Sequence, residues 1–312
     1  MTMKPEVGPL PLRRPATGTP DAPAAARTIY RRPILLSAQP TSYCPGCGHG
    51  IVHRLIAEVL EELGVADRTI LVGSVGCAVF AYDYLRLDAV ESPHGRAAAV
   101  ATGVKRYRPD RVVFTYQGDG DLAAIGTAEI VHAAARGERI TVIFVNNGIY
   151  GMTGGQMAPT TLAGQKTTSS PLGRDTRTQG YPLPVTELLS LLPGVAYAAR
   201  GCIAEPGLIG KTKAMIRRAF DVQLEDTGLS IVEVLSTCPV GWGMTPTESM
   251  QRLESEVMGA YPVGLFVDRA KGVGQAMPAP VGRASPAGGC AAAAPGPGVP
   301  AKEAGPARPA EA

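Results

Sequence analysis

Short apolar runs alternate with longer amphipathic stretches through the middle of this 312-residue chain. The apolar runs have the length of strands, and the first three are apolar almost throughout, which is typical of strands covered on both faces. The predicted strands are residues 69–73, 112–116, 140–145 and 230–235. Helical spacing between them, as at Leu55, Val59 and Leu63, predicts an α/β fold with a doubly wound, mainly parallel sheet. Ligands of such sheets bind beyond the carboxyl ends of the strands.

The two ends of the chain differ from the middle in composition. Residues 1–33 are rich in Pro, Ala and Arg, and residues 269–312 consist mostly of Ala, Gly and Pro. Such segments have little apolar area to bury, and their prolines block helix and ladder hydrogen bonds. We therefore expect both ends to be disordered and residues 34–268 to form the folded domain.

Composition excludes several classes of protein. Hydrophobic residues make up 45% of the chain, charged residues 18%, and the net charge is +3. This charge offers no basic face for nucleic acid, and no apolar run reaches the roughly 18 residues of a transmembrane helix. The chain start lacks the apolar segment of a secretory signal, and six cysteines are too few for a disulfide scaffold of this length. We expect a cytoplasmic protein that binds neither nucleic acid nor membrane.

A Gly-Asp-Gly turn follows the second predicted strand. Gly118 and Gly120, with Ala123, match the G-x-G-x-x-A turn of dinucleotide-binding proteins. Asp119 argues against that alternative, because its carboxylate would lie beside an anionic pyrophosphate. A carboxylate is suited to this position if a divalent cation lies between it and the phosphate.

An Asn-Asn pair follows the next predicted strand. Asn146 and Asn147 would face the Gly-Asp-Gly turn at the same edge of the sheet and offer amide and carbonyl oxygens. With Asp119, these are hard oxygen ligands of the kind that Mg²⁺ prefers. The order and spacing of the two turns resemble the diphosphate–Mg²⁺ motif of thiamine-diphosphate enzymes. The alternative is a pair of ordinary turns, because Gly and Asn are common in turns.

Four of the six cysteines stand at turns, two in a C-x-x-C pair ahead of a helix and two after strands. They are Cys44, Cys47, Cys77 and Cys238. Four thiolates could hold one Zn²⁺ or one 4Fe–4S cluster, although zinc ribbons usually bring two C-x-x-C pairs. A thioredoxin-like pair and buried, inert thiols are the other interpretations. Cys202 and Cys290 have no comparable setting.

These motifs together resemble the β subunit of 2-oxoacid:ferredoxin oxidoreductases. The resemblance covers residues 34–268 and is closest to the enzymes for branched-chain 2-oxoacids such as 2-oxoisovalerate, with the 2-oxoglutarate enzymes next. The matching runs are residues 43–50, 75–77, 94–96, 118–121, 146–156 and 238–239.

The resemblance implies roles for individual residues. Mg²⁺ would be bound by Asp119, Asn147 and the carbonyl of Ile149, and one 4Fe–4S cluster by Cys44, Cys47, Cys77 and Cys238. His94 and Arg96 would lie near the diphosphate or the substrate as the catalytic pair. The remaining residues expected to line thiamine diphosphate are Gly76, Gly118, Gly120, Asp121, Tyr150, Thr153, Gly154, Gly155 and Gln156.

The resemblance also implies a reaction and its partners. The expected reaction is oxidative decarboxylation of a 2-oxoacid to an acyl-coenzyme A, with electrons passed through the cluster to ferredoxin. In the family, the glutamate that activates the cofactor belongs to the pyrimidine domain of a separate α subunit. Whether further ferredoxin-like subunits join the complex stays open. The glutamates here are expected at the surface. We therefore expect the chain to be inactive without its partner.

Several other residues carry weaker expectations. His49 and His53 lie four residues apart, a spacing that could bind a metal, but without an H-E-x-x-H pattern we expect them in the helix core or surface. Trp242 is expected to shield the cluster or merely to pack. The polar loop 151–184 is expected to contact another subunit.

Two other classes of function stay open at this point. A non-oxidative thiamine-diphosphate decarboxylase or synthase would share the two turns but have no use for four placed cysteines. A scaffold protein that binds zinc and has lost its cofactor site would contain zinc and no iron.

Overall fold

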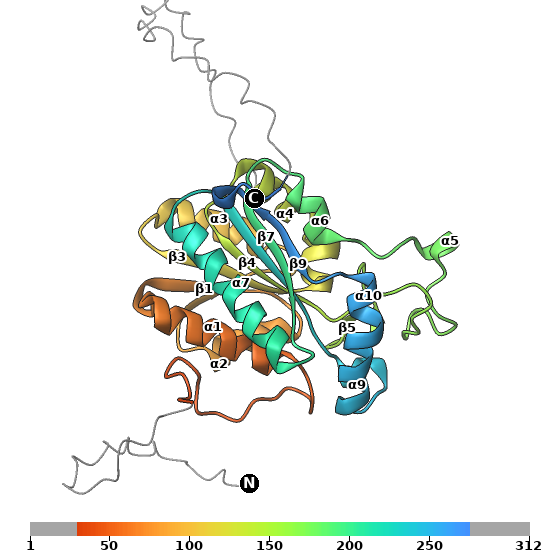
Figure 1. Cartoon of the computed structure of the whole chain (residues 1–312). Helices are drawn as coiled ribbons and strands as arrows, with labels where there is room; N and C mark the ends of the chain where they lie inside the picture. Colours follow the sequence, from red (N-terminus) through yellow and green to blue (C-terminus); the bar gives the residue numbers. More distant parts are fainter. Residues whose placement is uncertain (1–29, 275–312) are drawn as a thin grey trace, which may run out of the picture. The chain divides into compact units, whose positions relative to one another are not determined.

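A seven-stranded sheet forms the centre of the computed structural model, in the order β2-β1-β3-β4-β8-β7-β9 (Figure 1). Neighbouring strands pair parallel, except β7 and β9, which pair antiparallel. The predicted α/β class with a mainly parallel sheet is confirmed. The strands are β1 (Thr69–Gly73), β2 (Asp88–Glu91), β3 (Val112–Gly118), β4 (Thr141–Asn146), β7 (Val195–Cys202), β8 (Leu229–Leu235) and β9 (Gly264–Asp268), and a separate hairpin joins β5 (Ile149–Tyr150) to β6 (Gln156–Met157).

Helices cover both faces of the sheet, so the fold is doubly wound (Figure 1). One hydrophobic core packs α1 (His49–Leu63) and α7 (Pro206–Leu224) against one face, and the other packs α3 (Ala97–Tyr107), α4 (Thr127–Arg136) and α6 (Val185–Ser190) against the opposite face. The shorter helices are α2 (Ala81–Tyr84), α5 (Thr176–Gln179), α8 (Pro239–Trp242), α9 (Pro246–Arg252) and α10 (Met258–Ala260), with the 3₁₀ turns η1 (Ala66–Arg68), η2 (Cys77–Phe80) and η5 (Arg269–Lys271) and the π turns η3 (Asp121–Ile125) and η4 (Leu253–Val257).

Periodicity located the central elements and missed the flanking ones. The strands β1, β3, β4 and β8 fall on the predicted apolar runs. Strands β2 and β9 lie at the sheet edges, and all four residues of β2 are exposed, so neither needs an apolar run. Strand β7 was missed because its alanines, Gly201 and buried Arg200 do not resemble a β-branched strand.

The structure describes residues 30–274. The leader up to residue 29, the tail from residue 275 and Cys290 lie outside this part of the chain. The described fold extends past residue 268, because η5 follows and Asp268 bridges Val273. Within residues 30–274, no helix combines the length and apolar character needed to span a membrane.

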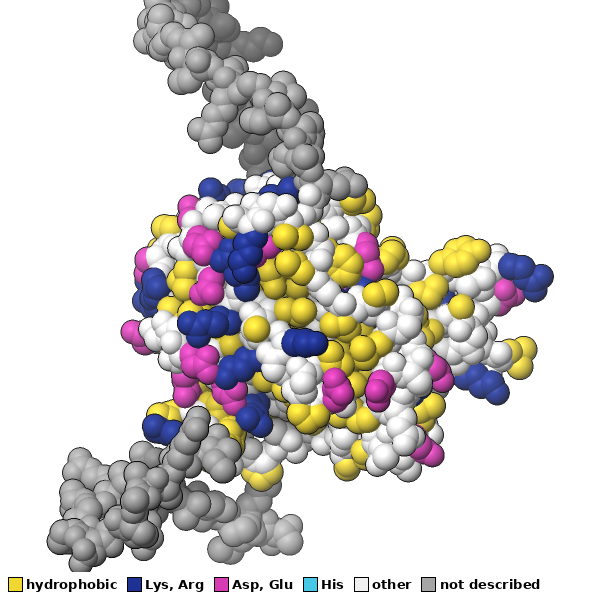
Figure 2. Space-filling view, viewed as in Figure 1, with side chains coloured by type: hydrophobic (Ala, Val, Ile, Leu, Met, Phe, Trp, Pro, Cys, Tyr) yellow, Lys and Arg dark blue, Asp and Glu magenta, His cyan; other side chains and the backbone are white. Residues whose placement is uncertain are grey.

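The polar loop of residues 158–184 forms an arm that contains α5 and projects from the sheet (Figure 1). Figure 2 shows apolar and basic side chains together on this projection. Leu172 is 96% exposed and Tyr181 is 79% exposed. The arm therefore presents apolar surface that the rest of the described chain does not cover.

Candidate functional site

A pocket opens at the carboxyl ends of three neighbouring strands, β1, β3 and β4. The chain leaves β1 toward β2 on one side of the sheet, while β3 pairs with β1 on the other side. Ligands bind at such topological switch points in open α/β sheets. The pocket is lined by His49, Val75, Gly76, Cys77, Ala78, His94, Gly118, Asp119, Gly120, Asp121, Asn147, Ile149, Tyr150, Gly151, Met152 and Thr153. Nearly all of the residues predicted to line a cofactor are among them.

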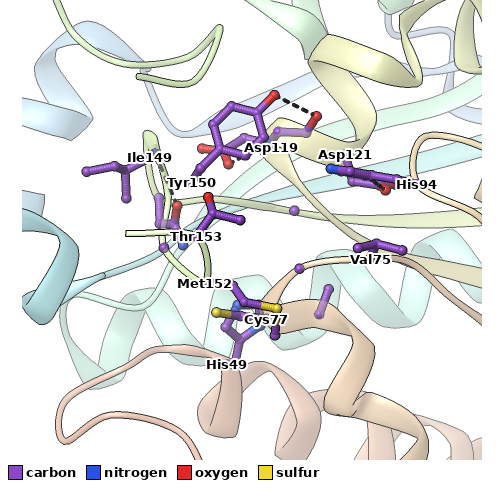
Figure 3. Close-up of a pocket in the computed structure, with 16 residues that line it drawn as sticks. His49, Val75, Cys77, His94, Asp119, Asp121, Ile149, Tyr150, Met152 and Thr153 are labelled. Carbon is purple, nitrogen blue, oxygen red and sulfur yellow. Dashed lines mark hydrogen bonds and ion pairs between the residues drawn. The ribbon is translucent and has the colours of Figure 1, made fainter. Parts of the chain in front are cut away.

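Asp119 is one of two buried carboxylates that line this pocket (Figure 3). Its Oδ1 accepts a hydrogen bond from the backbone N–H of Gly120 at 2.8 Å, and its Oδ2 accepts one from Thr160 Oγ1 at 2.8 Å. Burial raises the pKa of Asp119 to about 6, and these hydrogen bonds oppose that rise. A buried carboxylate fits a cation ligand, since a nearby positive charge would relieve the cost of burial.

The turn after β4 faces Asp119 across the pocket. Asn147 Oδ1 accepts a hydrogen bond from the backbone N–H of Ile149 at 3.3 Å, and the carbonyl of Asn147 accepts one from the indole N–H of Trp242 at 2.9 Å. Both Asn147 and Ile149 line the pocket with Asp119. The structure thus brings the three predicted magnesium ligands to one cavity, and their oxygen donors are of the type that Mg²⁺ prefers.

Two glycines leave room in the pocket for a large ligand. A side chain at Gly76 or at Gly118 would meet no atom within 4 Å, so both would extend into open space. Gly76 also has φ +105°, which an L side chain rarely adopts. The backbone at these positions therefore forms a bare cradle of the kind that diphosphate groups approach closely.

His94 and Asp121 form a pair at the rim of the pocket (Figure 3). Asp121 Oδ1 bonds His94 Nδ1 and accepts the backbone N–H of Gly95 at 2.7 Å, and Asp121 Oδ2 accepts Gln117 Nε2 at 2.7 Å. Asp121 therefore orients the ring of His94 and leaves Nε2 as its second polar atom. The π turn η3 begins at Asp121, and such turns are frequent at functional sites.

Arg96 and the end of the glycine-rich loop do not line this pocket. The guanidinium of Arg96 pairs with Glu129 at 2.8 Å instead. Thr153 lies in the pocket, whereas Gly154 and Gly155 line a separate depression. Gln156 bonds back to Thr153, since Gln156 Nε2 donates to the Thr153 carbonyl at 2.8 Å.

The predicted cysteine ligands converge beneath the same pocket. A Cβ on Gly151 would lie 3.1 Å from Cys238 Sγ and 3.8 Å from Cys77 Sγ, so these two sulfurs are at most about 7 Å apart. Burial raises the pKa of Cys47 to about 11 and that of Cys238 to about 12, and the nearby Cys77 raises both further. Cys44 acts on Cys47 and Cys77 in the same way, whereas the buried Cys202 interacts with none of the four. A shared positive centre would favour the thiolate forms of these cysteines.

Within the described part of the chain, these side chains do not form a site for a single metal ion. Within residues 30–274, no three His, Cys, Asp or Glu side chains lie close enough to hold one metal ion. Tetrahedral zinc would need sulfurs within about 4 Å of one another, because Zn–S bonds measure about 2.3 Å. A 4Fe–4S cluster holds its four cysteine sulfurs farther apart than a zinc ion does.

His49 is a pocket residue whose position the sequence analysis did not predict. It is 2% exposed, and its Nδ1 lies 2.6 Å from the Tyr116 hydroxyl. Figure 3 shows it beside Cys77, on the wall opposite Asp119 and Tyr150. Burial lowers the pKa of His49 to about 4, so the ring is neutral at pH 7. Its place two residues after Cys47, at the start of α1, was the available signal.

Comparison with known families defines the class first. The family "Thiamine pyrophosphate enzyme, C-terminal TPP binding domain" matches residues 74–234, which contain the pocket turns after β1, β3 and β4. The class defined by this fold and site is that of the thiamine pyrophosphate enzymes.

Relatives narrow this class to one family. The chain is 46% identical over 248 residues to ketoisovalerate oxidoreductase subunit VorA of Methanothermobacter thermautotrophicus, covering 80% of this chain and 52% of that protein. It is 38% identical over 252 residues to 2-oxoglutarate synthase subunit KorB of Methanocaldococcus jannaschii, covering 74% of this chain and 89% of that protein. The chain belongs to the family of 2-oxoacid:ferredoxin oxidoreductase β subunits. It spans about half the length of the VorA relatives.

A solved structure shares the fold. The 2-oxoglutarate:ferredoxin oxidoreductase from Magnetococcus marinus, determined with 2-oxoglutarate, coenzyme A and succinyl-coenzyme A bound, superimposes with a TM-score of 0.62. The match has 24% sequence identity and covers 80% of this chain and 87% of that chain. The resemblance inferred from the sequence motifs is therefore confirmed at the level of family and fold.

Proposed function

We propose that this chain is the cofactor-binding β subunit of an enzyme that oxidatively decarboxylates a 2-oxoacid. The product is an acyl-coenzyme A, and ferredoxin accepts the electrons. The observation that carries the proposal is one pocket whose upper wall holds Asp119 and Asn147 and whose floor meets the sulfurs of Cys77 and Cys238 at Gly151. An oxidative reaction needs a cluster site next to the diphosphate site, because electrons must be accepted there. A non-oxidative reaction has no need of the cluster.

Asp119, Asn147 and the carbonyl of Ile149 would hold Mg²⁺ and, through it, the diphosphate. When bound, thiamine diphosphate supplies an electron sink at the keto carbon of the substrate. His94, held by Asp121, places Nε2 at the pocket rim, where it can donate or accept a hydrogen bond to the substrate or the diphosphate. Burial of this wall excludes water from the ionic contacts and strengthens them.

Cys44, Cys47, Cys77 and Cys238 would hold one 4Fe–4S cluster. Three of these cysteines are partly buried, and the fourth, Cys44, is exposed. The exposed side gives an external electron acceptor access to the cluster, while Cys77 lines the cofactor pocket. Electrons would thus enter from the pocket and leave through the surface near Cys44.

The substrate class is a 2-oxoacid, and we propose a branched-chain one such as 2-oxoisovalerate. The 46% identity to the VorA subunit supports this choice over 2-oxoglutarate, for which the KorB relative is 38% identical. Coenzyme A, the α subunit and any further ferredoxin-like subunits belong to the same proposal.

Selective loss of each cofactor tests the proposal. In the full chain, purified with its co-purifying subunits, Asp119→Ala is expected to weaken magnesium-dependent binding of thiamine diphosphate by at least roughly 100-fold, because a metal ligand is lost. Iron and sulfide should remain. Cys47→Ser should bleach the absorption at about 400 nm and keep thiamine diphosphate. Isothermal titration and iron analysis measure the two outcomes.

Matched controls are Asp110→Asn, at an exposed carboxylate, and Cys202→Ala, at a buried thiol outside the group of four. Both should retain both cofactors. Retained thiamine-diphosphate affinity in Asp119→Ala would reject the magnesium assignment. A colourless wild-type protein that contains zinc would favour the scaffold alternative.

A further inference from the structure

We propose that Arg200 anchors a buried two-armed network that positions both magnesium-binding turns. This inference rests on the proposed function, because it concerns how Asp119 and Asn147 are held toward the metal. Arg200 lies on β7, outside the pocket, and its side chain is 0% exposed. A fully buried guanidinium is costly, so its partners define its role. Its two terminal nitrogens donate to the Glu187 carboxylate, and one of them also donates to the Pro262 carbonyl at 3.1 Å. Two further contacts of the guanidinium lead toward the pocket.

The first arm runs through Glu233 to the turn after β4. Arg200 Nε pairs with Glu233 Oε2 at 2.8 Å, and both side chains are almost completely buried. The other carboxylate oxygen, Glu233 Oε1, accepts a hydrogen bond from Asn146 Nδ2 at 2.7 Å. Asn146 Oδ1 in turn accepts the backbone N–H of Gly148 at 3.1 Å. The side chain of Asn146 therefore stabilises the turn that carries Asn147.

The second arm runs through Tyr261 to Asp119. The guanidinium of Arg200 lies 5.1 Å from the centre of the Tyr261 ring, within the range of a cation–π contact. The Tyr261 hydroxyl donates to the carbonyl of Thr160 at 2.9 Å, and Thr160 Oγ1 donates to Asp119 Oδ2 at 2.8 Å. The first arm therefore ends on the backbone of the turn that carries Asn147, and the second ends on the Asp119 carboxylate.

This network explains why an asparagine stands at position 146, the first of the Asn-Asn pair. Its amide must donate to a carboxylate at one end and accept from a backbone N–H at the other, which neither aspartate nor an apolar residue can do. Asn146 and Glu233 are accordingly positioning residues. They set the location of the ligands and need not contact the cofactor.

Exchanging the hydrogen-bond donor at position 146 with the acceptor at position 233 tests the first arm. Asn146→Asp places a second carboxylate against that of Glu233. Glu233→Gln removes the negative charge that pairs with Arg200. Each change alone is expected to weaken magnesium-dependent binding of thiamine diphosphate by roughly 10-fold or more, because a hydrogen bond to a charged group is lost. The double variant restores one donor and one carboxylate between positions 146 and 233. It should recover most of the affinity.

A conservative change tests the second arm. Tyr261→Phe keeps the ring over Arg200 but loses the bond to Thr160, and it should weaken binding by about 5-fold. The control is Ser230→Ala, because the buried Ser230 hydroxyl donates to the Ala219 carbonyl and to Thr141 rather than to a member of the network. It should lower the melting temperature and leave the affinity unchanged.

The measurement is the dissociation constant of thiamine diphosphate, titrated at several Mg²⁺ concentrations, on the full chain with its co-purifying subunits. Equal affinities for thiamine diphosphate in the wild type and in all variants would overturn the proposed network and leave the proposed function standing. The network would also be overturned if affinity fell only in proportion to the melting temperature, in Ser230→Ala as in the other variants. No magnesium-dependent binding in the wild type would overturn the proposed function and this inference together.

Discussion

Gly151 lies where the two halves of the site meet. It lines the pocket with the predicted magnesium ligands, and a Cβ at this position would lie 3.1 Å from Cys238 Sγ. That contact is closer than packed atoms normally come, and the interior around it cannot relax freely. The absence of a side chain at this position therefore lets the hairpin of β5 and β6 lie against the sulfurs.

Adding one methyl group at Gly151 should reduce binding of the cluster more than it reduces binding of thiamine diphosphate. We expect Gly151→Ala to lower the iron content and the absorption at about 400 nm. Magnesium-dependent thiamine-diphosphate binding should change little, because Asp119 and Asn147 are not displaced. Gly103→Ala is the control, since an added Cβ on that α3 residue meets nothing within 4 Å. Full iron content in Gly151→Ala would contradict the placement of the sulfurs.

The arm of residues 158–184 is held together by one side chain. Arg174 is 6% exposed and donates to backbone carbonyls along the arm, at Thr161 (2.6 Å), Tyr181 (2.8 Å), Pro159 (2.9 Å) and Gly180 (2.9 Å). A guanidinium offers five N–H donors in a fixed geometry, which suits a loop with few partners of its own. Thr160, the hydrogen-bond partner of Asp119, lies at the base of this arm.

Removal of this side chain should loosen the arm without unfolding the sheet. In Arg174→Met, we expect amide hydrogens of residues 159–181 to exchange at least about 10-fold faster, because several charge-assisted hydrogen bonds are lost. The amides of β3, β4 and β8 should keep their protection. Arg177→Met is the control, since Arg177 is 88% exposed and pairs with the neighbouring Asp175. Unchanged exchange in Arg174→Met would show that the arm is held by other contacts.

At the level of the whole molecule, the pocket lacks one group that thiamine enzymes require. No glutamate of the described residues lines it. Glu58, Glu62, Glu129 and Glu138 each form ion pairs elsewhere in residues 30–274, and Glu61 accepts the backbone N–H of Leu35. Under the proposed function, the activating carboxylate would come from outside this part of the chain. The exposed Met152 and Leu172 are surface that a partner could cover.

The chain should accordingly depend on a partner for activity. Purified alone, it is expected to reduce ferredoxin with 2-oxoisovalerate and coenzyme A at no more than the background rate. The complex isolated with its co-purifying chains should be active. A spectrophotometric ferredoxin assay on both preparations measures the difference. Turnover by the isolated chain would show that an activating group is present in the chain itself.

The sequence alone predicted the parts of this protein that depend on local order. The apolar runs of β1, β3 and β4 defined a buried parallel sheet, and the turns that follow them placed Asp119 and Asn147 at one edge, since parallel strands end together. The resemblance of the same motifs predicted the family, because turn geometry and ligand chemistry restrict which residues can stand there.

Only the tertiary structure decided which distant residues support that edge. Arg200, Glu233 and Tyr261 are separated along the chain by tens of residues, and Arg200 meets the other two through the pairing of β7 with β8 and through the segment that precedes β9. His49 enters the pocket because α1 packs on the sheet beside Tyr116. The Arg96 side chain forms an ion pair with Glu129 on the neighbouring helix α4. Such contacts depend on packing between elements, for which the sequence carries no fixed spacing.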